Sequence, residues 1–200
     1  MDIKKSEALN KMIQGAELLL QGLSSYTGDS FSLLDHNFVD TPARIAKSYR
    51  EMCEGLGRED EVAKILATHF PSTYNGMVII DSIEVFSMCP HHFLPVKYKV
   101  DFGYIPNGHA LGLSKIPRFI ELLAKRPVLQ EDLATDIISL FTSAVKPEGC
   151  IVVLDGQHGC MQCRGAKQAN SSAITSEVYG SFKESVTRSE FLDLIKLRRF

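Results

Sequence analysis

The chain has 200 residues, with 22 Lys and Arg set against 24 Asp and Glu, a formal net charge of −2 and 44% hydrophobic residues. This is the profile of a globular protein large enough to bury a core. Its apolar runs, such as 77–80 and 151–154, are far shorter than the roughly 20 residues that cross a bilayer. The first five residues have no signal-peptide character, so we expect a cytoplasmic protein without a membrane partner. The near-neutral charge also argues against a nucleic-acid partner.

Five segments carry apolar residues at the spacing of an amphipathic helix. The second of them starts at Thr41 and Pro42, an N-cap residue followed by a first-turn proline. Ser114 is expected to cap the third helix, and Thr187 opens a capping-box pattern for the last. The predicted helices cover 6–22, 42–52, 114–123, 129–145 and the residues from 187 onward.

Residues 96–104 alternate between apolar and polar side chains, the pattern of a half-buried strand. Three further segments rich in β-branched residues also predict strands, so that the strands cover 77–86, 96–104, 150–154 and 174–179. Strand pairs separated by helices are typical of an α+β domain with an antiparallel sheet backed by helices. We expect an N-terminal helical region over 1–70 and a sheet-containing catalytic region over 71–200, together forming one compact subunit.

The five cysteines are an odd number in a chain without secretory signals, so we expect reduced thiols rather than a disulfide framework. Cys89 lies in the two-proline loop 87–95, between the first two predicted strands and three residues before His92. In a turn, this spacing lets Cys89 and His92 close on one metal ion. Adjacent side chains point apart in such a backbone, so we expect one of His91 and His92 to be a ligand and the other to move protons.

A second polar loop, 155–165, contributes His158, Cys160, Cys163 and Arg164. If this loop is locally extended, the alternation of a strand puts His158, Cys160, Gln162 and Arg164 on one face and Cys163 on the other. Cys160 then becomes a third metal ligand. Two thiolates and one imidazole leave a tetrahedral zinc ion with an open position, the arrangement that activates water.

Cys163 keeps two other arrangements open. Together with Cys89, His92 and Cys160 it supplies four ligands, enough for a closed structural zinc site. The closed site needs a tight turn at each pair, whereas an extended loop turns Cys163 away. A redox-active pair of Cys160 and Cys163 is the other arrangement, although no thioredoxin-like pattern surrounds it.

Two predicted helix starts carry groups suited to a nucleotide. Ser114, Lys115 and Arg118 combine a hydroxyl and two cations with exposed helix amides, which suits a phosphate. A capped helix with solvated charges has the same pattern. Gln130 and Glu131 fit ordinary first-turn residues of the next helix, and a carboxylate there can equally read the two N–H donors on the edge of guanine.

Taken together, these segments resemble the GTP cyclohydrolase I family. The resemblance covers roughly four fifths of the chain, in family order, and is specific as a combination although each short motif is weak alone. The matching segments are 40–47, 89–92, 103–106, 112–115, 126–131, 158–160, 164–165, 182–183 and 187–192.

The resemblance implies a T-fold, in which an antiparallel four-stranded sheet is backed by two helices, with an N-terminal helical extension. It implies Zn²⁺ held by Cys89, His92 and Cys160, and proton transfer by His91 and His158. The substrate-binding residues that it implies are Ser114, Lys115, Arg118, Gln130, Glu131, Arg164 and, from a neighbouring subunit, Arg44. It also implies a homo-oligomer, a decamer with active sites at its subunit interfaces.

The implied activity is the zinc-dependent conversion of GTP to 7,8-dihydroneopterin triphosphate and formate, the first step of tetrahydrofolate and pterin biosynthesis. Several of its steps transfer protons, for which histidines have suitable pKa values. Two other functions stay open. One is an oligomer that binds a purine or pterin without catalysis and uses zinc structurally; the other is a related enzyme that stops at an intermediate or acts on another purine or pterin.

Overall fold

The computed structural model describes residues 3–197, and these divide into two compact units, one ending at Met52 and the other starting at Cys53. In the N-terminal unit, α1 (Ile3–Tyr26) packs against α2 (Thr41–Met52). The segment between them is ordered by the rings of Phe31 and Phe38, which stack with centroids 4.8 Å apart. Both helices were predicted, and α2 begins at Thr41, one residue before the predicted first helical residue, so that Thr41 belongs to the helix rather than capping it.

The boundary between the units differs from the prediction. The sequence places it at residue 70, whereas the structure assigns the helix α3 (Glu59–Leu66) to the second unit. The reason is packing, because α3 lies against α4 (Lys115–Ala124) and inserts Val62 and Leu66 into the main hydrophobic core. No helix was predicted at α3 from the sequence.

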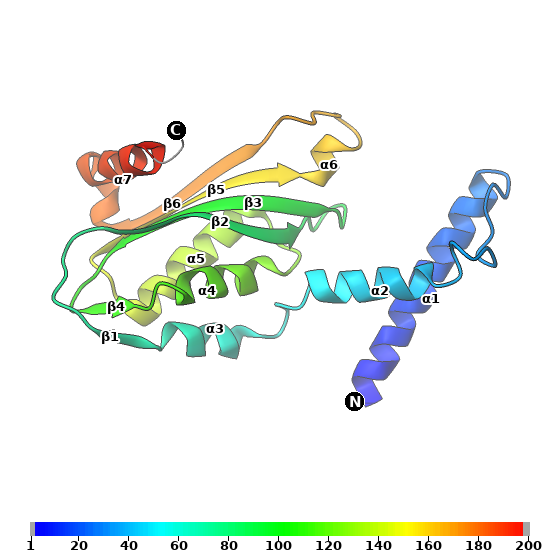
Figure 1. The fold of residues 1–200 in the computed structure, drawn as a ribbon, viewed down its shortest axis with the longest axis horizontal. Coiled ribbons are helices and arrows are strands. Elements are labelled where there is room, and N and C mark those ends of the chain that lie inside the picture. Colours follow the sequence, from blue (N-terminus) through cyan, green and yellow to red (C-terminus); the bar gives the residue numbers. More distant parts are fainter. Residues whose placement is uncertain (1–2, 198–200) are drawn as a thin grey trace. The chain divides into compact units, whose positions relative to one another are not determined.

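The second unit is built on a four-stranded antiparallel sheet of order β2-β3-β5-β6 (Figure 1). Its strands are β2 (Val78–Met88), β3 (Pro95–Ile105), β5 (Gly149–His158) and β6 (Ala173–Gly180). The predicted strands all form, and each extends beyond its predicted range at one end or both. A separate two-stranded sheet, which the sequence did not predict, pairs β1 (His69–Pro71) with β4 (His109–Leu111).

Two helices, α4 and α5 (Gln130–Val145), cover one face of the four-stranded sheet (Figure 1). The alternation along β3 turns Tyr98, Val100, Phe102 and Tyr104 toward these helices, and all four are fully buried. The prediction of an α+β fold, with an antiparallel four-stranded sheet, two backing helices and an N-terminal helical extension, is confirmed.

The opposite face of the sheet carries α7 (Ser185–Leu197), preceded by a short 3-10 turn, η1 (Ser181–Lys183). Phe182, Phe191 and Ile195 form a second, smaller core there with Ile151 of β5. The strand residue beneath it is Gly103, where a Cβ atom would lie 2.8 Å from the Phe191 ring. Glycine at this position therefore allows α7 to approach the sheet closely.

Two predicted helix caps differ in detail. Ser114 occupies the N-cap position of α4, but its backbone is already helical and its hydroxyl makes no capping hydrogen bond. The last helix begins at Ser185, so Thr187 lies inside it rather than at its cap. Within residues 3–197, no helix has the length and apolar character needed to cross a membrane.

Phe141 of α5 is the centre of the aromatic packing, with its ring centroid 4.9 Å from that of Phe102 and 5.2 Å from that of Tyr104. We expect Phe141→Ala to lower the free energy of unfolding by about 3–5 kcal/mol, because it removes a fully buried ring and leaves a cavity. Urea denaturation measures this loss. Phe70→Ala is the matched control, because Phe70 is half exposed. Equal losses of unfolding free energy in the two variants would contradict the central place of Phe141 in the core.

Candidate metal centre and active site

The loop between β2 and β3 is a tight turn that positions Cys89 and His92. The Cys89 N–H donates to the Leu94 carbonyl oxygen, and the Phe93 N–H donates to the Cys89 carbonyl oxygen, both at 2.9 Å. The turn brings Cys89 Sγ and His92 Nδ1 to 3.7 Å from each other. His91 is outside this group, as expected from the prediction that the two adjacent histidines are not equivalent.

The extended conformation considered for the loop 155–165 ends at His158 and does not include Cys160. β5 ends at His158, and the chain turns at once into a short helix, α6 (Gly159–Gln162). A Cβ atom at residue 159 would lie 2.9 Å from the Pro95 carbonyl oxygen, so glycine allows the helical turn to begin close against β3. The turn nevertheless brings the Cys160 sulfur to 3.8 Å from the Cys89 sulfur.

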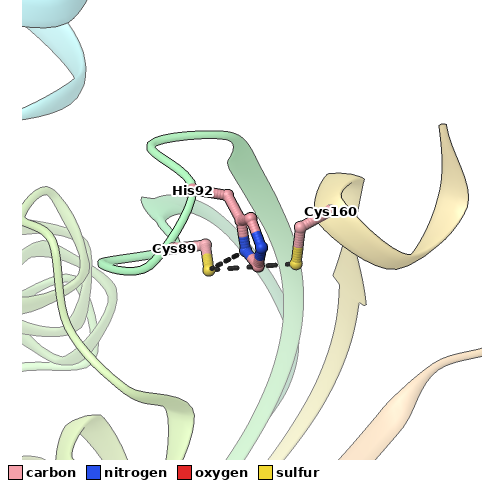
Figure 2. A group of neighbouring side chains, drawn as sticks. All are labelled: Cys89, His92 and Cys160. Atoms are coloured by element: carbon pink, nitrogen blue, oxygen red, sulfur yellow. Dashed lines mark hydrogen bonds between the residues drawn. The ribbon is translucent and has the colours of Figure 1, made fainter. Parts of the chain in front are cut away.

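Cys89, His92 and Cys160 therefore form a group that can hold a metal ion, with all three ligand atoms within 4.8 Å of one another (Figure 2). Zn–S bonds of about 2.3 Å and Zn–N bonds of about 2.0 Å separate tetrahedral ligand atoms by about 3.5–3.8 Å. The separations of 3.7 Å and 3.8 Å fit this donor set. Among the described residues, no fourth Cys, His, Asp or Glu joins the group, which leaves a coordination position for water or substrate.

Cys163 does not close the metal-capable group. It is exposed at the end of α6, and its thiol donates to the Gly159 carbonyl oxygen at 2.9 Å. The neighbouring Arg164 is exposed as well, and it acts on the group through its charge. Burial and the adjacent Cys89 raise the pKa of the Cys160 thiol, and the Arg164 guanidinium opposes this rise. Arg164 thus favours the thiolate form of Cys160, the form that binds metals.

A cavity of about 200 Å³ adjoins the metal-capable group, and both remaining predicted histidines line it. His91 is exposed on the β2–β3 turn, whereas His158 lies half-buried at the end of β5. Burial lowers the pKa of His158, and the charge of Glu131 opposes this shift. A neutral imidazole at pH 7 can accept a proton, so the cavity combines a metal-capable group with proton-transfer groups.

Gln130 and Glu131, the first two residues of α5, also line this cavity but differ in exposure. The Glu131 side chain is exposed at the cavity, where a carboxylate is accessible to a ligand. The Gln130 side chain is buried, with 3% of its surface exposed, and it bonds to His158 and to the backbone of β5 and β6. The structure therefore separates two residues that the sequence analysis grouped together.

Tyr98 is a residue of this site that the sequence analysis missed. It is fully buried on β3, and its ring meets the His158 ring edge to face with centroids 6.1 Å apart. Its hydroxyl has no hydrogen-bond partner among the described residues. Burial and then the charges of Glu131 and Cys89 raise the pKa of Tyr98. The alternation of β3 indicates that Tyr98 is buried, but only the register with β5 places it beside His158.

Ser114, Lys115 and Arg118 are not brought to this cavity within one chain. They start α4 beside β4, at the sheet end where the Leu111 N–H donates to the Tyr104 hydroxyl. The β2–β3 loop and α6, which carry the metal-capable group, lie at the other end of β3 (Figure 1). Tyr104 and Val96 are eight residues apart along β3, and the length of strand between them is about 26 Å.

Arg44, which was also predicted to bind the triphosphate, lies outside the second unit. It lies on α2 in the N-terminal unit, where its guanidinium pairs with Asp40 at 3.2 Å.

The structure brings seven of the predicted site residues together around one cavity or its metal-capable group: Cys89, His91, His92, Gln130, Glu131, His158 and Cys160.

A metal-capable group with an open position, beside two histidines that are not ligands, is typical of a hydrolytic enzyme rather than of a closed structural metal site. The comparisons with known proteins identify the family. The profile of the GTP cyclohydrolase I family matches residues 32–196, and the chain belongs to this family of enzymes.

The relatives support this assignment along almost the whole chain. A GTP cyclohydrolase 1 from Porphyromonas gingivalis is 40% identical over 198 residues, which cover 99% of both chains. Another from Thermobifida fusca is 39% identical over 164 residues, covering 80% of this chain and 78% of the relative. One from Dehalococcoides mccartyi is 41% identical over 160 residues, covering 78% and 84%.

The geometry of the cysteines predicts which thiols bind metal. We expect Cys160→Ser to lose bound metal during purification, because it removes one of three ligands, whereas Cys163→Ser keeps the wild-type metal content. Metal analysis of the two purified variants by mass spectrometry measures this difference. Loss of metal from Cys163→Ser with retention in Cys160→Ser would contradict the three-ligand group.

Proposed function

We propose that this chain is a zinc-dependent GTP cyclohydrolase I that converts GTP to 7,8-dihydroneopterin triphosphate and formate. The reaction is the first step of pterin and folate biosynthesis, and the proposed location is the cytoplasm, where thiols stay reduced. The observation that carries the proposal is the group of Cys89, His92 and Cys160 in a cavity shared with His91 and His158. Family membership supports the same substrate.

The three ligands would hold zinc, which when bound supplies a Lewis-acid position where water becomes nucleophilic near neutral pH. His91 and His158 would transfer the protons. One proton goes to a ring nitrogen as the five-membered ring opens at C8, and another goes to the nitrogen that leaves the formyl carbon as formate departs. Ring opening and formate release each consume one water. After rearrangement of the ribose, ring closure releases one water, so that one water is consumed overall.

Glu131 is the group proposed to read the guanine base. Its carboxylate is exposed in the cavity at the start of α5. A carboxylate offers two acceptor oxygens, which match the N1–H and the amino group on the edge of guanine. Its charge reaches the reacting groups as well, since it acts on the pKa values of both His158 and Tyr98.

Completion of the triphosphate site would require a second copy of the chain. Ser114, Lys115 and Arg118 lie at the far end of the sheet from the metal-capable group, so their proposed contacts with a triphosphate come from a neighbouring subunit. Arg164 would act from the same subunit as the zinc ligands, and Arg44 from a neighbour. Exposed leucines on α1, namely Leu18, Leu19 and Leu23, also favour association. We propose a homodecamer with interfacial active sites.

Incubation of the zinc-loaded protein with GTP tests the activity. We expect formate and a product with the mass of 7,8-dihydroneopterin triphosphate. His91→Ala and His158→Ala are each expected to lower kcat by about 100-fold or more, because each removes a proton-transfer group. Release of a formylated product without ring closure would indicate a truncated reaction. Unchanged GTP in the presence of confirmed zinc would contradict the proposed activity.

Mixed oligomers test the shared site. We expect Lys115→Ala and His158→Ala proteins, each inactive alone, to recover activity when co-assembled, because about one site in four then combines intact residues from two chains. The matched control is a mixture of His91→Ala and His158→Ala, whose residues line one cavity of one chain, and it should stay inactive. Analytical ultracentrifugation of the active protein measures the assembly, and a fully active monomer would rule out an interfacial site.

A further inference from the structure

Gln130 is a buried polar side chain whose hydrogen bonds are all directed into the protein. Its amide nitrogen lies 2.8 Å from the Ala173 carbonyl oxygen, 3.2 Å from that of Leu154 and 3.2 Å from the Thr175 hydroxyl. Its amide oxygen lies 2.8 Å from His158 Nε2. Both N–H groups are therefore taken up by β5 and β6, and neither is left for a base in the cavity.

These partners fix which way the amide faces. Carbonyl oxygens accept hydrogen bonds and never donate them, so the two carbonyls of Leu154 and Ala173 require the NH₂ end of Gln130. The oxygen end must then face His158. An amide oxygen is only an acceptor, and His158 Nε2 must therefore carry the hydrogen in the contact of 2.8 Å.

We propose that Gln130 is a positioning residue that holds His158 as the tautomer protonated on Nε2. A neutral imidazole carries one N–H, so Nδ1 is left with its lone pair as the nitrogen that receives a proton in the reaction. The part that His158 Nδ1 plays in catalysis rests on the proposed function. The role of Gln130 as a partner of His158 differs from the expectation that its side chain contacts guanine.

The residues around Gln130 and His158 leave room for their contact. A Cβ atom at Gly156 would lie 2.4 Å from the Gln130 amide oxygen and 2.6 Å from the Tyr98 ring. Glycine at this inward-facing position of β5 leaves the space that the amide occupies. The Tyr98 ring packs against the imidazole with an interplanar angle of 85°. His158 is thus held by one hydrogen bond and one aromatic contact, both from residues of its own chain.

The tautomer is tested directly by magic-angle-spinning NMR of the zinc-loaded wild-type protein labelled with ¹⁵N-histidine. The His158 signals are assigned by their absence in His158→Asn. We expect a protonated Nε2 and an unprotonated Nδ1, and a change in these signals in Gln130→Met, which keeps the length of the side chain but cannot bond. A hydrogen on Nδ1 in the wild-type protein would overturn the proposal, whether or not the protein is active.

Kinetics separate positioning from base recognition. We expect Gln130→Met to lower kcat by about tenfold or more with KM for GTP changed by less than about threefold, because the interaction acts on a catalytic group. Gly156→Ala, which displaces the amide without removing it, should show the same pattern. Glu131→Gln is the contrasting variant and should raise KM. A raised KM with unchanged kcat in Gln130→Met would overturn the proposal in favour of a guanine contact.

Thermal unfolding of each variant accompanies these measurements. If Gln130→Met and Gly156→Ala fail to fold, the NMR of the wild-type protein alone decides the tautomer. If the wild-type protein forms no product from GTP, the proposed function fails, while the tautomer measurement still supports or overturns the role of Gln130.

Discussion

The site depends on the antiparallel pairing of β3 with β5. Their register sets Val96 opposite His158, so the loop before β3 and the turn after β5 meet at one end of the sheet. Cys89 and Cys160 are 71 residues apart in sequence, yet their sulfur atoms lie 3.8 Å apart. A shift of one residue would turn His158 to the opposite face of the sheet. The pairing of β3 with β5 extends over ten positions. This pairing brings the ligands of the metal-capable group together.

The sheet also explains why one side of the site is buried and the other is exposed. His158 and Tyr98 stand on the sheet face that α4 and α5 cover, where Gln130 of α5 hydrogen-bonds to His158 and the buried Tyr98 ring packs against the imidazole. His91 and His92 lie on a turn at the surface.

The sequence predicted the elements with the longest periodic patterns, because a half-buried strand or helix repeats its apolar residues many times. It missed α3, whose first turn carries Glu59, Asp60 and Glu61, an acidic signal that suits a helix N-terminus. It considered an extended conformation for the loop 155–165, since the four residues of α6 contain too few repeats to distinguish a strand from a helical turn. The difference did not affect Cys160, because a helical turn also presents that thiol toward Cys89.

The sequence by itself determined the kind of chemistry: a thiol and an imidazole at metal-ligand spacing, a second polar loop with a thiol and a histidine, and an α+β pattern that matches one enzyme family. Each loop motif is local and can be recognised within about ten residues, whereas the family pattern is recognised only along most of the chain. Only the tertiary structure decided that Cys163 is outside the metal-capable group, that Gln130 bonds to His158, and that Lys115 lies at the far end of the sheet. Those outcomes depend on strand register and on the direction of single side chains, which arise from contacts between distant segments.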